Sequence, residues 1–138
     1  YNGDDICMNQ NLSPMNKAQL IIRILFGLIL VIFGSNKFLH FMPMPPMPEA
    51  AGAFMGALVD SGYLMTLVAL VEIVAGVSIL INKYKTLALV ILLPVILNAF
   101  LFHLFLDLSG IAGSAVALMM NLFLMYANKE SYRSLLKS

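Results

Sequence analysis

Long apolar runs, separated by short polar segments, make up most of the chain. They predict membrane-spanning helices at about residues 18–41, 63–81, 86–106 and 110–127, because each run is close to the ~20 residues that cross ~30 Å of hydrocarbon. The links after the second and third runs are very short, so the helices that they join must run antiparallel. The expected fold is an all-α membrane protein, built as an antiparallel four-helix transmembrane bundle.

The longest break in this pattern follows the first run. Prolines interrupt a Met-rich stretch at residues 43–48, and the next segment begins with Glu49 and contains Gly52 and Gly56. An acidic residue in the first turn suits the helix dipole, but a helix over residues 48–60 is too short to span a bilayer. A short re-entrant or interfacial helix is therefore expected in this first outer loop.

Composition excludes several classes of protein. Hydrophobic residues make up 61% of the chain and charged residues 11%, whereas soluble domains have about 45–50% and about 25%. A net charge of +1 without a basic stripe excludes nucleic acid as a partner. The single cysteine, Cys7, excludes an internal disulfide and a CxxC pair. A redox role would thus require a bound cofactor, a quinone or a partner's thiols.

Charge distribution predicts the orientation. One side of the bundle carries the basic residues Lys17, Arg23, Lys83, Lys85, Lys129, Arg133 and Lys137. The other side carries Glu49, Asp60 and Asp107. The positive-inside rule places both termini in the cytoplasm and the first and third loops outside the cell membrane. The expected domains are a polar cytoplasmic tail (1–17), the transmembrane domain (18–128) and a basic cytoplasmic tail (129–138). The first run lacks a following small-x-small cleavage site, which favours a retained helix over a signal peptide.

Ionisable residues within spanning helices are costly and are functional candidates by default. Lys37 lies roughly 21 Å above Arg23 along the first helix at 1.5 Å per residue, and His40 is one turn further out. Glu72 lies near the middle of the second helix, and Lys37 is the lysine at a depth that reaches it. Two interpretations stay open: a structural Lys37–Glu72 ion pair or a neutral, hydrogen-bonded Glu72, and an acid that handles protons or a ligand.

A second group lies at the outer end of the third helix. His103 and Asp107 are four residues apart, so the carboxylate is expected to pair with the imidazole and to orient it. Asn98 lies on another face of the third helix and is expected to support the site. Histidines beside a carboxylate suit a quinone head group, whose carbonyls accept hydrogen bonds and whose protons titrating groups exchange. The alternative is that both histidines only hydrogen-bond loops at the interface. The candidate quinone or proton-handling residues are Lys37, His40, Glu72, Asn98, His103 and Asp107.

Two further patterns have more ordinary explanations. His40 with Met42, Met44 and Met47 offers soft ligands for Cu(I), but an alternating Met-Pro segment is also a stiff apolar stretch on the lipid surface. A copper site is therefore not favoured. On the fourth helix, a small polar stripe is expected to pack against its neighbours; it consists of Ser114, Ala117 and Asn121.

Several segments resemble the DoxX-like family of small integral membrane proteins over residues 20–126. They read LFGLILVIFGSNKFL, PEAAGAFMGAL, ALVEIVAGVSILINKY and LLPVILNAFLFHLFLD. The resemblance implies a four-helix membrane bundle. Relatives include membrane subunits of thiosulfate:quinone oxidoreductase, partners in membrane-associated thiol and oxidative-stress complexes, and assembly factors. The lack of cysteines within the predicted spans argues against direct thiol chemistry.

The resemblance and the polar residues together leave open whether the chain is an enzyme. The first hypothesis is a membrane subunit of a quinone-linked oxidoreductase system, for which a link to sulfur or thiol chemistry stays open. Quinone is the candidate cofactor, and the cofactor itself stays open. The alternatives are a non-catalytic accessory or assembly subunit of a larger membrane complex, and a proton-coupled small-molecule carrier that uses Glu72 and Lys37. Expected partners are the lipid bilayer and other membrane or periplasmic proteins, and a homo-oligomer stays open.

Overall fold

The computed structural model describes residues 14–136. These residues form six α-helices and one short 3-10 turn, and they contain no strand. The predicted all-α class is therefore confirmed. Cys7 and most of the N-terminal tail lie outside the described residues, as does Lys137 at the other end.

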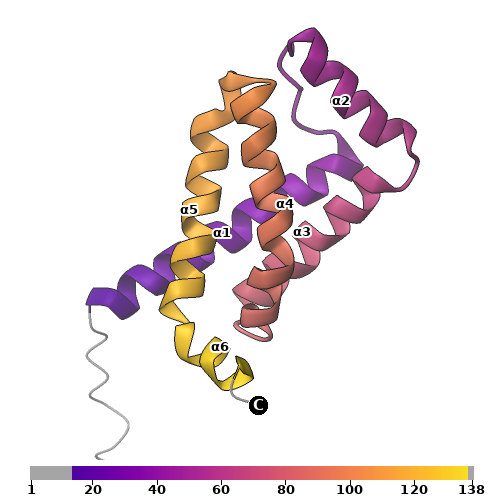
Figure 1. Cartoon of the computed structure of the whole chain (residues 1–138). Helices are drawn as coiled ribbons and strands as arrows, with labels where there is room; N and C mark the ends of the chain where they lie inside the picture. Colours follow the sequence, from indigo (N-terminus) through magenta and orange to yellow (C-terminus); the bar gives the residue numbers. More distant parts are fainter. Residues whose placement is uncertain (1–13, 137–138) are drawn as a thin grey trace, which may run out of the picture.

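Four long helices make up the body of the protein. They are α1 (Pro14–Leu39), α3 (Leu64–Leu80), α4 (Lys85–Phe105) and α5 (Ile111–Ala127). Each lies within a few residues of a predicted span. The start of α1 at Pro14 fits the missing N–H of proline, which the first turn of a helix does not use. In Figure 1, α4 and α5 stand as an upright hairpin, whereas α1 and α3 run obliquely across it.

Three helical segments are long and apolar enough to cross a membrane: Met15–Leu39, Lys85–Phe105 and Leu108–Ala127. Helix α3 has 17 residues. It follows α2 (Glu49–Asp60) after a short break at which the two axes bend by 87°. The α2–α3 pair, taken as one broken span, provides a fourth candidate crossing.

Helices α1 and α3 approach closely because glycines face each other across their contact. A Cβ atom added to Gly76 would lie 2.9 Å from the carbonyl oxygen of Gly27. One added to Gly27 would lie 3.1 Å from the carbonyl oxygen of Gly76. Beside this crossing, large apolar side chains from four helices form the core; the fully buried ones are Phe26, Ile79, Leu89, Leu92 and Leu124. The bundle is thus held by close backbone contact on one side and by side-chain packing on the other.

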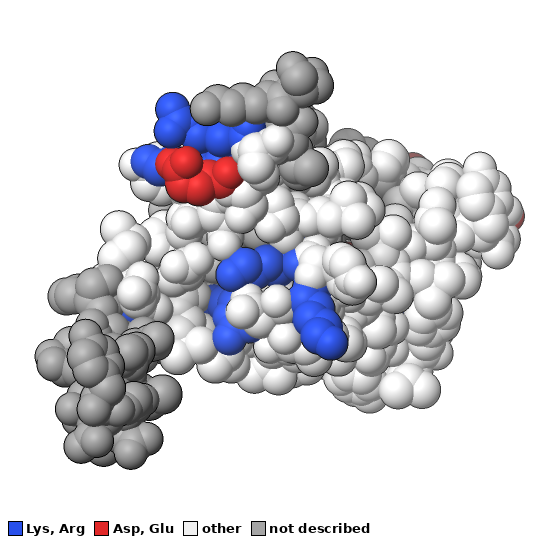
Figure 2. Space-filling view, turned by 90° about the horizontal axis from the view of Figure 1, so that it is seen from below, with Lys and Arg blue, Asp and Glu red and all other residues white. Residues whose placement is uncertain are grey.

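The two ends of the bundle differ in charge. We call the end at which α1 and α4 begin the basic end, and the opposite end, covered by α2, the α2 end (Figure 1). At the basic end, the C-terminal segment forms a further helix, α6 (Lys129–Leu136), and its Tyr132 hydroxyl donates to the carbonyl of Thr86 at 2.9 Å. In the view from below, Lys and Arg side chains gather on this face (Figure 2).

Candidate functional site

The predicted acid and lysine meet between α1 and α3. Lys37 Nζ donates to Glu72 Oε2 at 2.5 Å, and both side chains are largely shielded, with 24% and 11% of their surface exposed. The expected contact between the two side chains is therefore present, and both interpretations of Glu72 include it. A carboxylate at this depth keeps its charge only beside a cation.

A glycine one turn before Lys37 makes this contact possible. A Cβ atom on Gly34 would lie 3.1 Å from the carbonyl oxygen of Ala69 and 3.2 Å from Cβ of Glu72. Because Gly34 has no side chain, α3 lies against the backbone of α1 at the level of Glu72. Lys37, three residues further along the same face of α1, then reaches over the carboxylate.

His40 ends α1 and lies apart from the ion pair. Its φ of 50° is in the left-handed region, its amide donates to the carbonyl of Asn36 at 2.8 Å, and its side chain is exposed. The side-chain oxygen of Asn36 accepts from the amide of Met42 at 2.8 Å, which holds the start of the Met-Pro segment against the helix end.

The contact between His103 and Asp107 differs from the expected one. His103 Nδ1 lies 2.9 Å from the main-chain oxygen of Asp107, not from its carboxylate. The carboxylate Oδ1 instead accepts from the amide and the hydroxyl of Ser109 at 3.1 and 2.7 Å. It thereby caps the 3-10 turn η1 (Leu108–Gly110). The Ser109 hydroxyl and amide hold the pKa of the Asp107 carboxyl below its usual value. Asp107 therefore orients the ring through its backbone.

Close packing also fixes the His103 ring. A Cβ atom on Gly110 would fall among the ring atoms of His103, so only glycine fits beneath it. The ring meets that of Phe102 edge-on at 5.1 Å, and Phe102 lies 5.6 Å from Phe54 on α2. These aromatic contacts join α2 to the α4–α5 turn. Gly110 and Phe54 were not among the sequence candidates, because contacts between distant segments leave no local pattern.

The six predicted residues are not joined in one hydrogen-bond network among the described residues. Within residues 14–136, no hydrogen bond or ion pair links the Lys37–Glu72 pair to His103 or Asp107. Asn98 is exposed on α4, as is Pro94 one turn earlier, so this face of the helix points away from the bundle. Among the described residues there is also no cluster of three or more His, Cys, Asp or Glu side chains that would hold a metal.

A buried amide on α5 is a further polar feature. Asn121 has no exposed surface, and neither its side-chain oxygen nor its nitrogen has a hydrogen-bond partner. The sequence predicted it as a packing residue. An amide without partners is costly in a protein interior, and more so within a membrane. Asn121 therefore reduces stability where it stands.

Comparison with known proteins agrees with the helical architecture. The DoxX family model matches residues 18–105, a region that runs from α1 to the end of α4 and includes Lys37, Glu72 and His103. No curated protein and no solved structure matches the chain significantly. The family match covers more than half of the 138 residues. This integral membrane protein therefore belongs to the DoxX family.

Proposed function

We propose that this DoxX family protein is a non-catalytic subunit of a larger membrane complex and that it binds a helix of another membrane protein through its α2 end. The observation that carries the proposal is the uncovered glycine face of α2. A Cβ atom on Gly52 or on Gly56 would meet no atom within 4 Å. Small residues at this four-residue spacing let a second helix approach closely within a membrane.

The rest of the α2 end supports a protein partner. Helix α2 buries only Ala51. Large apolar side chains around it are exposed; they are Leu39, Phe41, Met44, Val59 and Tyr63. An uncovered apolar surface of this kind marks a contact with protein or lipid. Lipid chains adapt to any apolar surface, whereas a flat glycine face specifically favours a helix backbone. A glycine contact of the same kind joins α1 to α3, where Gly27 and Gly76 face each other.

The test compares assemblies in mild detergent. Wild-type protein, extracted from its native membrane and run on native gels, is expected to migrate with a partner in a large complex. Gly52→Leu and Gly56→Leu fill the open face and should release the free subunit. Gly113→Leu is the matched control, because a Cβ atom there also meets nothing within 4 Å but lies on α5. Migration of the wild-type protein as a lone chain or small homo-oligomer would contradict the proposal.

A quinone-linked role is the second candidate, and a groove between α3 and α4 favours it. The groove has a volume of about 300 Å³ and an apolar lining that includes Val71, Ala75, Ala88 and Ile91, with the side chains of Ser78 and Tyr84 at its polar positions. Such a slot suits a lipid-soluble ring, whose carbonyl would accept a hydrogen bond from the Tyr84 hydroxyl.

Quinone extraction and titration test this second candidate. Pure protein is expected to retain quinone in a lipid extract and to bind added quinone. Weaker binding in Tyr84→Phe would assign the ring to the groove, and weaker binding in His103→Ala would assign it to the α2 end. A quinone-free extract with no binding on titration would exclude the role.

A further inference from the structure

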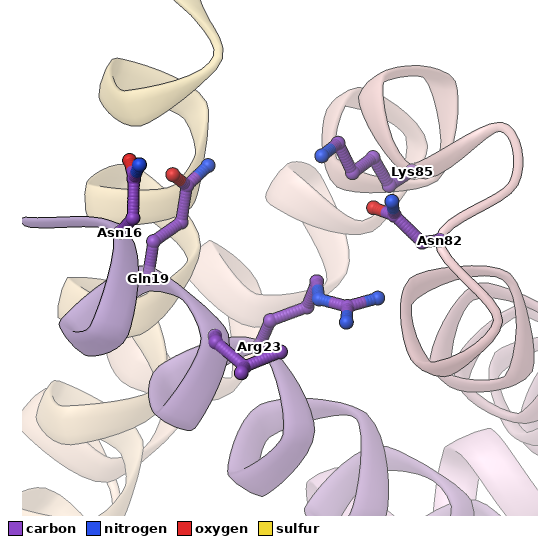
Figure 3. A pocket seen from close by; sticks show the side chains of 6 residues that line it. Asn16, Gln19, Arg23, Asn82 and Lys85 are labelled. Atoms are coloured by element: carbon purple, nitrogen blue, oxygen red, sulfur yellow. The ribbon is translucent and has the colours of Figure 1, made fainter. Parts of the chain in front are cut away.

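A polar pocket opens at the basic end, at the opposite end of the bundle from His40 and His103. It has a volume of about 200 Å³. Its lining comes from the start of α1, the turn between α3 and α4, and the first residue of α4; the residues are Asn16, Gln19, Leu20, Arg23, Asn82 and Lys85 (Figure 3). Two regions that are distant in the sequence thus contribute polar side chains to one pocket.

The pocket contains two cationic side chains. Arg23 extends from α1 and Lys85 from α4, and the two cations are close enough to repel each other. Among the residues that the structure describes, none that lines the pocket is acidic. Figure 3 shows Asn16 and Gln19 on α1 at one side of the pocket, with Lys85 and Asn82 at the other side. Amide N–H groups together with ammonium and guanidinium groups form a set of donors that suits an anion with several oxygens.

Two helix ends lie at this pocket. Arg23 Nη1 donates to the carbonyls of Ile79 and Leu80 at 3.0 and 3.1 Å, and so neutralises the negative end of α3. Helix α4 begins at Lys85, and its preceding residue, Tyr84, makes no side-chain cap. The positive end of α4 therefore reinforces the two cations.

We propose that this pocket binds a phosphate group. Its place at the start of two membrane spans puts it at the level of lipid head groups, where basic pockets between helices bind anionic lipids. The phosphate comes either from such a head group or from a soluble phosphate, and the chemistry of recognition is shared: Arg23 and Lys85 neutralise the charge, and the amides donate to the remaining oxygens.

Native mass spectrometry of the full chain in neutral detergent tests the proposal with three probes: phosphatidylglycerol, phosphatidylcholine and inorganic phosphate. Lys85→Gln should weaken phosphatidylglycerol binding about fivefold, the effect of one lysine near an anionic surface. Asn82→Asp, which adds a negative charge to the lining, should weaken it further. Lys83→Gln is the matched control, because Lys83 is exposed in the same turn but is not part of the lining. Equal thermal stability of the variants without lipid would show that they are folded.

The outcomes separate the two sources of phosphate. Binding of phosphatidylglycerol alone, with the dependence on Lys85, assigns the pocket to a lipid head group. Binding of inorganic phosphate with the same dependence assigns it to a soluble phosphate. If Lys85→Gln and Lys83→Gln weaken phosphatidylglycerol binding equally, the proposal is overturned, because diffuse surface charge would then explain the binding. Binding of phosphatidylcholine as tight as that of phosphatidylglycerol, or no binding of any probe, would overturn it as well.

Discussion

At the residue scale, the Lys37–Glu72 pair is the most consequential contact, because each charge makes the other tolerable between α1 and α3. A buried ion pair adds little stability compared with apolar residues of the same size, since both charges have lost their water. Removing one partner is different, because the remaining charge stays buried without compensation. The pair therefore makes the two positions interdependent.

A double-mutant cycle measures this dependence. Glu72→Gln leaves Lys37 unpaired and should lower the free energy of unfolding by about 3–5 kcal/mol. Adding Lys37→Met to Glu72→Gln removes the stranded cation and should recover most of that loss. Unfolding in mixed micelles provides the measurement. A double variant no more stable than Glu72→Gln alone would show that the pair is not coupled.

Replacing Asn121 is expected to stabilise the protein, whereas replacing Glu72 is expected to destabilise it. Leucine has a similar size, so Asn121→Leu keeps the packing and removes the two unpartnered polar atoms. The substitution should raise the free energy of unfolding by about 1–3 kcal/mol, the usual cost of an unsatisfied buried group. Asn98→Leu is the control: its side chain is exposed on α4, so the substitution changes folded and unfolded states similarly. A less stable Asn121→Leu would mean that the amide has a partner in the membrane.

At the element scale, the α1–α3 pair depends on backbone contact. Gly76→Ala places a methyl group 2.9 Å from the carbonyl oxygen of Gly27, and a carbonyl on a helix cannot rotate away. The helices must move apart, which should cost about 1–3 kcal/mol of stability. Gly113→Ala, whose added carbon meets nothing within 4 Å, should leave thermal stability in detergent almost unchanged. Equal effects of the two substitutions would contradict the close approach.

The positions of the helices could be predicted from the sequence, but most of the contacts between them could not. Hydropathy depends on each residue by itself, so α1, α4 and α5 appear in the sequence at nearly their observed bounds. The Lys37–Glu72 contact could also be predicted from the sequence, because few charged residues lie at membrane depth. The His103 ring was not: its partner is a main-chain oxygen, which every residue possesses. Likewise, no local pattern indicates the 87° bend between α2 and α3.

At the scale of the whole molecule, the basic and α2 ends differ in the charges that they carry. The loops and helix starts at the basic end contain Lys17, Lys83, Lys85 and Lys129, whereas Glu49 and Asp60 flank α2. Because positive residues remain in the cytoplasm, we propose that the basic end is cytoplasmic and that α2 lies outside.

Cysteine labelling tests this orientation. Cys7 is the single cysteine of the chain, so Cys7→Ser provides an unlabelled background. On it, Asp60→Cys should react with a membrane-impermeant maleimide on intact cells, and Lys83→Cys only after the cells are opened. Both side chains are exposed, so access through the membrane alone decides the outcome. The reverse labelling pattern would mean that the basic end lies outside and α2 lies in the cytoplasm.

Two of the cations of α1, Arg23 and Lys37, also have a consequence for how the protein is made. Arg23 bonds to α3 carbonyls 56 and 57 residues later in the chain, and Lys37 to a carboxylate 35 residues later. When the ribosome has completed α1, both partners are still unsynthesised, and the apolar helix carries a charge without a counterion at membrane depth. We therefore expect α1 to stay with the insertion machinery until α3 emerges, so that the two helices enter the lipid as a pair.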